Sequence, residues 1–344
     1  MVVPVDVAAL HARTVVVDGH RDVYEQNWQR SLGCATPLQT HTLPRLRRGG
    51  VSLVVYAICG DTIDHAFGTD RYQHAALDNL DGFYDEADAP DSGIAVIRTR
   101  ADVPARPDGR VHFLLHFEGG RPLEGSLGAL RMFYRLGLRS LQLTWNVRNE
   151  LGDGVHERRS GGGLTVFGVD VVRECHRLGI VVDLAHASPA TFFHALEVSG
   201  DRPIVVSHAN ASALCDHPRN LTDDQLRALR ANGGLVGAHS AVAFTDPQRP
   251  TVDRLVDHIA YLAERVGIDH VYFGPDFTRS DGPRSPRDRG FPGVQGLHLD
   301  GLEEIDELPA LTAALLRRGF AEPEVQGILG ENFARFLRRT LPEA

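Results

Sequence analysis

The chain has 344 residues, of which 42% are hydrophobic and 24% are charged, as in an ordinary globular protein. Its net charge of −9 and the lack of a basic block argue against a nucleic-acid or membrane-surface binder, because both partners repel an acidic surface. The N-terminus carries no basic region followed by a long apolar core, and no apolar stretch approaches membrane-spanning length. We therefore expect a cytoplasmic protein, although a secreted form that has lost its signal would look the same.

The cysteines are few and widely separated in the sequence. Cys34, Cys59, Cys175 and Cys215 show no CxxC spacing. This usage favours free thiols in a reducing compartment over a disulfide framework.

Eight short runs rich in β-branched residues recur along the chain. Their nearly continuous apolar character is typical of parallel strands that are covered on both faces. The predicted strands are Thr14–Val17, Val51–Ile58, Val111–His116, Ser140–Leu143, Ile180–Asp183, Ile204–Ser207, Leu235–Ala238 and Val271–Phe273.

Helical patterns lie between most of these runs. The predicted helices are Leu127–Leu136, Val166–Leu178, Pro189–Leu196, Thr222–Asn232, Val252–Val266 and Leu308–Arg318. Strand–helix alternation over this length predicts a single-domain (β/α)8 TIM-like barrel spanning residues 1–344, with a doubly wound open sheet as the alternative. Pro275–Gly296 is rich in Pro, Gly, Arg and Asp and is predicted to be one long loop.

Polar residues follow several of the predicted strands. His20 and Asp22 come after the first strand, and their i, i+2 spacing places both side chains on one side of an extended segment. Glu118 follows the third strand and precedes two glycines, which permit close backbone approach to a ligand. Taken alone, each motif is also compatible with a polar turn or a loop carboxylate.

Three further polar residues occupy equivalent positions in the second half of the chain. His186 and His208 each end a strongly apolar run, where a single histidine is usually a hydrogen-bonded residue at the barrel rim. Asp276 follows an aromatic strand, where either an ion or an arginine would offset the cost of burying its carboxylate. Because the carboxyl ends of barrel strands meet on one face, the six residues together predict a site for zinc or a similar divalent ion. Six ligands exceed the needs of one tetrahedral zinc, which favours two ions that share a carboxylate.

The motifs that contain these residues resemble the renal (membrane) dipeptidase family of zinc peptidases, among the amidohydrolase-like metal-dependent barrels. The resemblance extends from about residue 15 to about residue 337. It rests on DGHRD (18–22), HFEGG (116–120), GLTVFGVDVVRECHRLGIVVDLAHAS (163–188), VVSHANA (205–211), HPRNLTDDQL (217–226), GPDF (274–277) and LPALTAALLRRGFAEPEVQGILGENF (308–333).

The resemblance implies a binuclear zinc site and an amide-bond hydrolase acting on a dipeptide. One ion would be held by His20, Asp22, Glu118 and Asp276, and the other by Glu118, His186 and His208, with Glu118 bridging. Water between the ions would be acidified to a pKa of roughly 7 and would attack the carbonyl. Asp276 would handle the proton, and the resemblance also allows for a homodimer.

Arg219, from the HPRN motif, would bind the substrate carboxylate through its planar set of donors. The alternative for Arg219 is an ion pair within its loop, for example with Asp216.

Two positions depart from the family pattern. Trp145 stands in LQLTWN, where the family has a histidine that stabilises the tetrahedral intermediate, and an indole has no proton to exchange. Trp145 would then reshape the substrate pocket. Arg21 stands where relatives carry a small or neutral residue; it is either a second substrate-binding cation or a partner of Glu25 or Asp18.

The sequence therefore supports three hypotheses. The first is a zinc dipeptidase, and the second is a divergent member of the family with a specialised, for example biosynthetic, substrate, as Trp145 and Arg21 suggest. The third is a metal-binding protein without activity, which the retention of all six ligand positions argues against.

Overall fold

The fold is described from a computed structural model that covers residues 5–277 and 299–343. Its central sheet has eight parallel strands in the order β1-β2-β4-β5-β6-β7-β8-β9, and a short β3 pairs with the N-terminal part of β4. The strands are β1 (Val16–Asp22), β2 (Val51–Gly60), β3 (Ile94–Val96), β4 (Val111–Glu118), β5 (Leu138–Gln142), β6 (Val181–Asp183), β7 (Val205–Val206), β8 (Leu235–Ala238) and β9 (Val271–Phe273).

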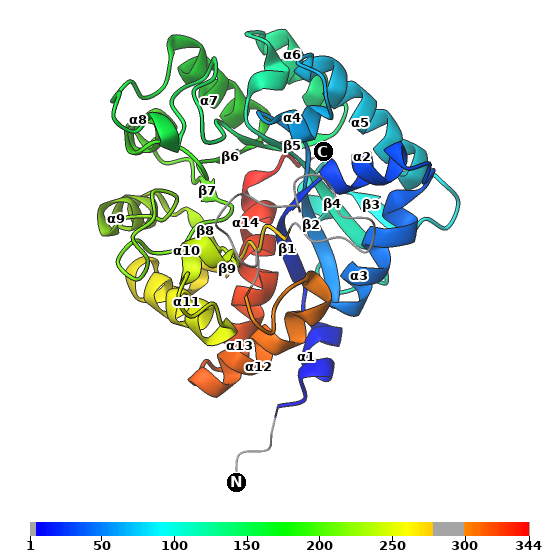
Figure 1. The fold of residues 1–344 in the computed structure, drawn as a ribbon, viewed down its shortest axis with the longest axis vertical. Helices are drawn as coiled ribbons and strands as arrows, with labels where there is room; N and C mark the ends of the chain where they lie inside the picture. Colours follow the sequence, from blue (N-terminus) through cyan, green and yellow to red (C-terminus); the bar gives the residue numbers. More distant parts are fainter. Residues whose placement is uncertain (1–4, 278–298, 344) are drawn as a thin grey trace.

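Helices surround this sheet on the outside and at one end (Figure 1). They are α1 (Val7–Arg13), α2 (Tyr24–Ser31), α3 (Leu43–Arg48), α4 (Ile63–Ala66), α5 (Tyr72–Ala87), α6 (Leu127–Arg135), α7 (Val166–Leu178), α8 (Pro189–Ser199), α9 (Asp223–Asn232), α10 (Val242–Thr245), α11 (Val252–Val266), α12 (Leu308–Arg318), α13 (Glu322–Gln326) and α14 (Asn332–Thr340). The strands form a nearly closed barrel, so the predicted (β/α)8 TIM-like fold is confirmed. Within the described residues, no helix is long and apolar enough to cross a membrane.

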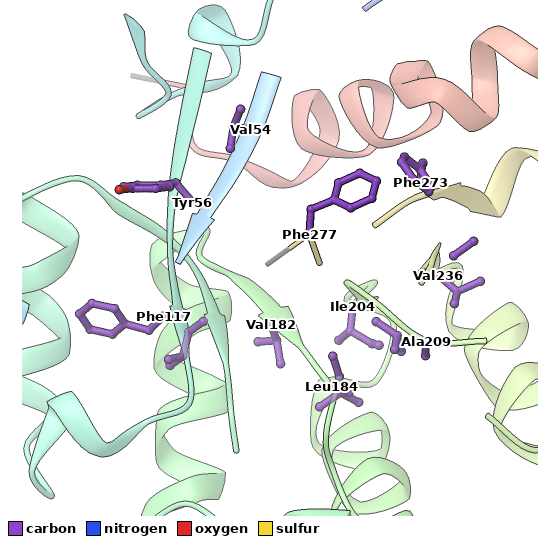
Figure 2. Close-up of a cluster of buried hydrophobic side chains, with 14 of the residues drawn as sticks. Val54, Tyr56, Phe117, Val182, Leu184, Ile204, Ala209, Val236, Phe273 and Phe277 are labelled. Atoms are coloured by element: carbon purple, nitrogen blue, oxygen red, sulfur yellow. The ribbon is translucent and has the colours of Figure 1, made fainter. Parts of the chain in front are cut away.

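Two apolar clusters lie on the two sides of the barrel wall. The larger one fills the layer between strands and helices, and Figure 2 shows part of it, including Val54 and Tyr56 of β2 and Phe117 of β4. The smaller cluster lies inside the barrel. There, residues from seven strands pack against Phe333, Phe336 and Leu337 of the C-terminal helix α14, so that this helix closes one end of the barrel.

The interior becomes polar toward the carboxyl ends of the strands. Along β4, Leu114 belongs to the inner apolar cluster, His116 is buried two residues later, and Glu118 ends the strand. This alternation is the period of two that a strand imposes. The catalytic face expected of such a barrel therefore lies at the end opposite the α14 plug.

Most predicted elements match the structure closely. The strands at 235–238 and 271–273 and the helices at 166–178, 252–266 and 308–318 have the predicted bounds. The first strand was predicted to end at Val17 but continues to Asp22, so that His20 and Asp22 belong to the strand itself. The predicted loop Pro275–Gly296 lies outside the described residues from residue 278 onward. The four cysteines are unpaired, as predicted.

An irregularity in β1 explains how its polar residues are oriented. Val15 and Val17 face the interior and Val16 faces the helices, so strict alternation would turn His20 outward. The pairing register with β2 shifts between Asp18 and Arg21, as in a β-bulge, which reverses the alternation. Beside the shift, a Cβ atom on Gly19 would lie 2.6 Å from the Phe273 carbonyl of β9, so glycine permits this close approach.

Candidate metal centre

Glu118 lies at the centre of the polar cluster at the end of the barrel. Its Oε1 atom is 3.1 Å from His186 Nε2, 3.5 Å from His20 Nε2 and 3.7 Å from His208 Nε2. Its Oε2 atom is 3.5 Å from the Nε2 atom of His65. One buried carboxylate thus has imidazole nitrogens on both of its oxygens, an arrangement suited to bridging two cations.

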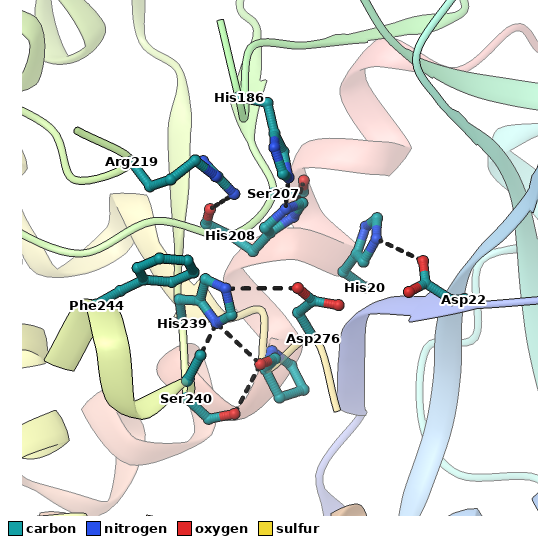
Figure 3. A network of polar contacts seen from close by, with 12 residues as sticks. His20, Asp22, His186, Ser207, His208, Arg219, His239, Ser240, Phe244 and Asp276 are labelled. Atoms are coloured by element: carbon teal, nitrogen blue, oxygen red, sulfur yellow. Dashed lines mark hydrogen bonds and ion pairs between the residues drawn. The ribbon is translucent and has the colours of Figure 1, made fainter. Parts of the chain in front are cut away.

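His186 and His208 form one half of the cluster. Their Nε2 atoms face each other at 2.8 Å (Figure 3). The Nδ1 atoms contact polar partners, Asn146 Oδ1 at 2.8 Å and Ser207 Oγ at 2.8 Å respectively. Such contacts to the outer nitrogen orient an imidazole and leave Nε2 available to a metal.

His20, Asp22 and Asp276 form the other half. His20 Nε2 lies 3.3 Å from Asp22 Oδ1, and both side chains point to the same side of β1, as their spacing predicted. Ligand atoms of His20, Asp22 and Asp276 all fall within 4.8 Å of one another. All six residues predicted to be ligands therefore meet at one end of the barrel.

Two of these residues have an unusual backbone conformation. His186 has φ of 64° and Asp276 has φ of 55°, values that L-residues other than glycine seldom adopt. Both residues lie just after short strands, where the chain changes direction. Non-glycine residues held in this region cost free energy and gather at functional sites.

Two histidines of the cluster were not predicted from the sequence. His65, on the short helix α4 after β2, is fully buried, and its Nε2 atom lies 3.0 Å from Asp22 Oδ1. His239 follows β8, and its Nε2 atom lies 3.5 Å from Asp276 Oδ2. His239 could have been found by its place after a predicted strand. His65 belongs to no motif, and its only signal is its proximity in sequence to the second strand.

The charges in the cluster perturb one another strongly. Burial and the neighbouring Asp22 raise the pKa of Glu118 to about 7. For His20, burial opposes protonation, but the neighbouring carboxylates of Asp22, Glu118 and Asp276 outweigh it and raise the pKa to about 10. Burial, with Arg219 and His20 nearby, lowers the pKa of His186 well below its usual range. Carboxylates and imidazoles crowded in this way are stabilised by a cation among them.

The donor set fits a metal. Among the described residues, the buried atoms His20 Nε2 and Glu118 Oε2 have no hydrogen-bond partner. Imidazole nitrogens and carboxylate oxygens are common ligands of zinc and related divalent ions. Buried polar atoms that lack a partner are expensive unless an ion or water satisfies them.

Comparisons with known proteins also support a metal site. The family model described as membrane dipeptidase (peptidase family M19) matches residues 5–341. The chain belongs to the M19 family. It is 32% identical to dipeptidase verJ of Clonostachys rogersoniana over 95% of this chain and 84% of that protein.

Solved structures of similar proteins place this M19 member among metallopeptidases and amidohydrolases. An amidohydrolase from Pseudomonas aeruginosa superimposes with a TM-score of 0.81 at 27% identity, covering 98% of this chain and 99% of the other. A metallopeptidase from Rhodobacter sphaeroides, liganded with a phosphinate mimic of the dipeptide L-Ala-D-Ala, has a TM-score of 0.80 at 28% identity and covers 95% and 99%. The chain is thus a metallo-dipeptidase-type hydrolase with a metal cofactor.

Arg219 of this M19 member is buried beside the metal cluster. Its Nη2 atom donates to the His208 carbonyl at 3.5 Å, and its guanidinium lies 5.5 Å from the centre of the Phe244 ring. Within the described residues it forms no ion pair, and none with Asp216, the alternative considered from the sequence. Burial lowers its pKa to about 10, so it remains a cation.

Trp145 lies against the metal cluster. Its ring stacks on His186, with centroids 5.7 Å apart and an angle of 29° between the planes. The buried carboxylate of Asp61, which follows β2, holds this segment by accepting from the backbone N–H of Trp145 at 3.1 Å and from Asn149 Nδ2 at 2.8 Å. Burial raises the pKa of Asp61 to about 6.

Arg21 is engaged away from the cluster. Its Nε atom donates to Asp18 at 2.6 Å and its Nη2 atom to Glu304 at 2.9 Å, while Arg45 donates to the other oxygen of Glu304 at 2.7 Å. Arg21 is 7% exposed. Of the two interpretations drawn from the sequence, pairing with Asp18 is observed. Binding of substrate by Arg21 stays a prediction; in the structure, two buried carboxylates already contact its guanidinium.

Proposed function

We propose that this protein is a binuclear zinc hydrolase that cleaves the amide bond of a dipeptide, or of a dipeptide-like substrate with a free carboxylate. The observation that carries the proposal is the position of Glu118, which is buried at the centre of the cluster and has imidazole nitrogens near both of its oxygens. His20, Asp22, Glu118 and Asp276 would hold one ion, and Glu118, His186 and His208 the other. When bound, divalent ions polarise a carbonyl and lower the pKa of water.

The remaining work of the reaction falls to the protein's own groups. Asp276 would take a proton from the attacking water and return it to the nitrogen of the leaving amine, so that water is consumed and one C–N bond is broken. The Nε2 atom of His239 lies 3.5 Å from Asp276 Oδ2 and would help to orient this carboxylate. Arg219 and His186 line the same small cavity. Arg219 would bind the substrate carboxylate through paired hydrogen bonds.

The test is turnover of a dipeptide panel by the zinc-loaded enzyme. The panel should include L-Ala-D-Ala, because the Rhodobacter sphaeroides relative was solved with a mimic of that dipeptide. Asp276→Asn should lower kcat by ~10²–10⁴-fold, the usual contribution of a general base, with the fold retained. Arg219→Met should mainly raise KM, because it removes a contact to the substrate carboxylate. Absence of turnover across the whole panel would count against the proposal.

A specialised substrate is the second candidate, and Trp145 favours it. An indole stacked on His186 narrows the space beside the cluster and offers a flat apolar surface to a substrate side chain. Trp145→His should then speed the cleavage of simple dipeptides or shift the preferred substrate. Unchanged rates and unchanged preference would remove the reason for this candidate.

The location and assembly of the protein remain proposals. The four unpaired cysteines support a cytoplasmic location, where thiols stay reduced. A homodimer is carried over from the family resemblance alone. Size-exclusion chromatography with light scattering would test it.

A further inference from the structure

We propose that His65 is a direct metal ligand, joining His20, Asp22, Glu118 and Asp276 around the first ion. The inference rests on the metal centre proposed above. It concerns a residue that the family resemblance does not include, since none of the matching motifs contains position 65.

The distances around His65 fit a shared ion. Neighbouring ligand atoms that lie ~2.1 Å from one four- or five-coordinate zinc are about 3.0–3.6 Å from one another. His65 Nε2 is 3.0 Å from Asp22 Oδ1 and 3.5 Å from Glu118 Oε2. The accepted pair in this half, His20 Nε2 and Asp22 Oδ1, is separated by 3.3 Å. The ligand atoms of Asp22, His65 and Glu118 lie within 4.8 Å of one another, as do those of His20, Asp22 and Asp276.

Hydrogen bonds from neighbouring residues fix the orientation of His65. Its Nδ1 atom lies 2.5 Å from Thr62 Oγ1, and Asn79 Nδ2 donates to the His65 carbonyl at 3.0 Å and to the Ile58 carbonyl at 2.8 Å. When Nδ1 donates its proton to Thr62, the lone pair of Nε2 is directed at the two carboxylates. Metal-binding histidines typically have their outer nitrogen fixed in this manner.

His65 would also give the two ions equal numbers of imidazole ligands. Glu118 Oε1 is shared by three imidazoles, whereas Oε2 faces His65. Without His65, the first ion would have one imidazole and the second would have two. With His65, each ion has two imidazoles and a share of Glu118, which places more neutral ligands around the half that carries the carboxylates Asp22 and Asp276.

The rival explanation is that His65 only orients Asp22 by an N–H···O hydrogen bond at 3.0 Å. The two roles differ in whether a bond joins the nitrogen to the metal. Scalar coupling through that bond can be measured in the full-length protein loaded with ¹¹³Cd and labelled with ¹⁵N-histidine.

A ¹H–¹¹³Cd or ¹⁵N–¹¹³Cd correlation spectrum should show four coupled imidazoles in the wild type. His65→Gln should remove one of them and weaken one cadmium site by at least 10-fold in a chelator competition. His74→Gln is the control, because His74 lies on the exposed face of α5, and it should remove no coupling. Thr62→Val should keep the coupling while weakening the same site by a smaller factor.

Three coupled imidazoles in the wild type, with the His65 nitrogens uncoupled, would overturn the inference and leave the metal centre standing. This count needs no variant, so a failure of His65→Gln to fold does not affect it. No coupled imidazole and no cadmium binding at all would instead overturn the metal centre itself. Dipeptidase activity does not enter either readout.

Discussion

Strand β1 separates two buried clusters of charge that are neutralised in different ways. On one side lies the metal centre, where Asp22 and Glu118 meet imidazoles. On the other side lies what we call the arginine cluster, composed of Asp18, Arg21, Arg45 and Glu304. The register shift in β1 places Asp18 and Arg21 of DGHRD on one side and His20 and Asp22 on the other.

The two clusters differ in which groups compensate the charge of their buried carboxylates. In the arginine cluster, two guanidinium groups face two carboxylates at 2.6–2.9 Å, so the charges cancel, and only Asp18 Oδ1 accepts no hydrogen bond within the described residues. In the metal centre, the neighbours are histidines; the pKa of His20 is raised, but burial lowers the pKa of His186 and His208 well below the usual range, so these two carry no charge. Buried ionised carboxylates without a fixed cation are unfavourable. The first cluster therefore serves stability, and the second requires an added ion.

The largest expected effect is that of Glu118→Gln, which keeps the size of the side chain and removes its charge. Both ions lose a shared ligand, so metal content should fall and turnover should drop by at least ~10³-fold. The free energy of unfolding of the metal-free protein should not fall, because a buried carboxylate has been removed. Metal analysis, kinetics and urea unfolding give the three readouts. Full metal occupancy in this variant would contradict the role of Glu118.

Arg21→Met tests the other cluster. It leaves Asp18 and Glu304 buried with less compensation, and breaking a buried ion pair in this way costs ~3–5 kcal/mol. The metal content of the folded protein should be unchanged. Arg110→Met is the control, because its pair with Asp108 is exposed and should contribute only ~0–1 kcal/mol. If Arg21→Met unfolded as the wild type does but had a raised KM, Arg21 would act on substrate after all.

Metal removal should separate the two clusters in the wild type. A ligand present at 100 times its Kd stabilises the folded state by ~2.7 kcal/mol, so a strong chelator should lower Tm by the corresponding amount. The same chelator should lower the Tm of Arg21→Met similarly and leave that of Glu118→Gln almost unchanged. An equal shift in all three proteins would indicate that the stabilising ion binds elsewhere.

Much of this arrangement could be predicted from the sequence. Parallel strands covered on both faces are continuous apolar runs, and the ends of such strands meet, so His186, His208 and Asp276 could be brought together from their positions alone. The i, i+2 spacing of His20 and Asp22 correctly predicted that they share a side.

The rest depends on contacts that local patterns do not encode. Arg21 and Glu304 are separated by 283 positions, and the bulge that turns Arg21 toward Asp18 has no sequence signature beyond Gly19. His65 comes from a four-residue helix in an irregular connection, where a single histidine is usually unremarked. In both cases, the role of the residue depends on tertiary contacts, and its neighbours in the sequence do not indicate that role.

The smallest effect expected here concerns a neutral partner of the metal centre. Asn146 Oδ1 lies 2.8 Å from His186 Nδ1 and orients that imidazole without contributing charge, unlike any member of the arginine cluster. Asn146→Ala should weaken the ion held by His186 and His208 by ~10-fold, at the lower end of the range for such outer contacts. Asn146→Asp restores an acceptor and should recover the affinity.

The design of this last pair separates charge from orientation. Chelator competition on each variant measures the affinity of the two ions in turn, and only the His186 half should respond. If Asn146→Ala bound both ions as tightly as the wild type, stacking by Trp145 would be sufficient to hold His186 in place. If Asn146→Asp bound the ion more tightly than the wild type, the metal centre would share one property with the arginine cluster, because added negative charge would then be compensated by the ion just as Asp18 is compensated by Arg21.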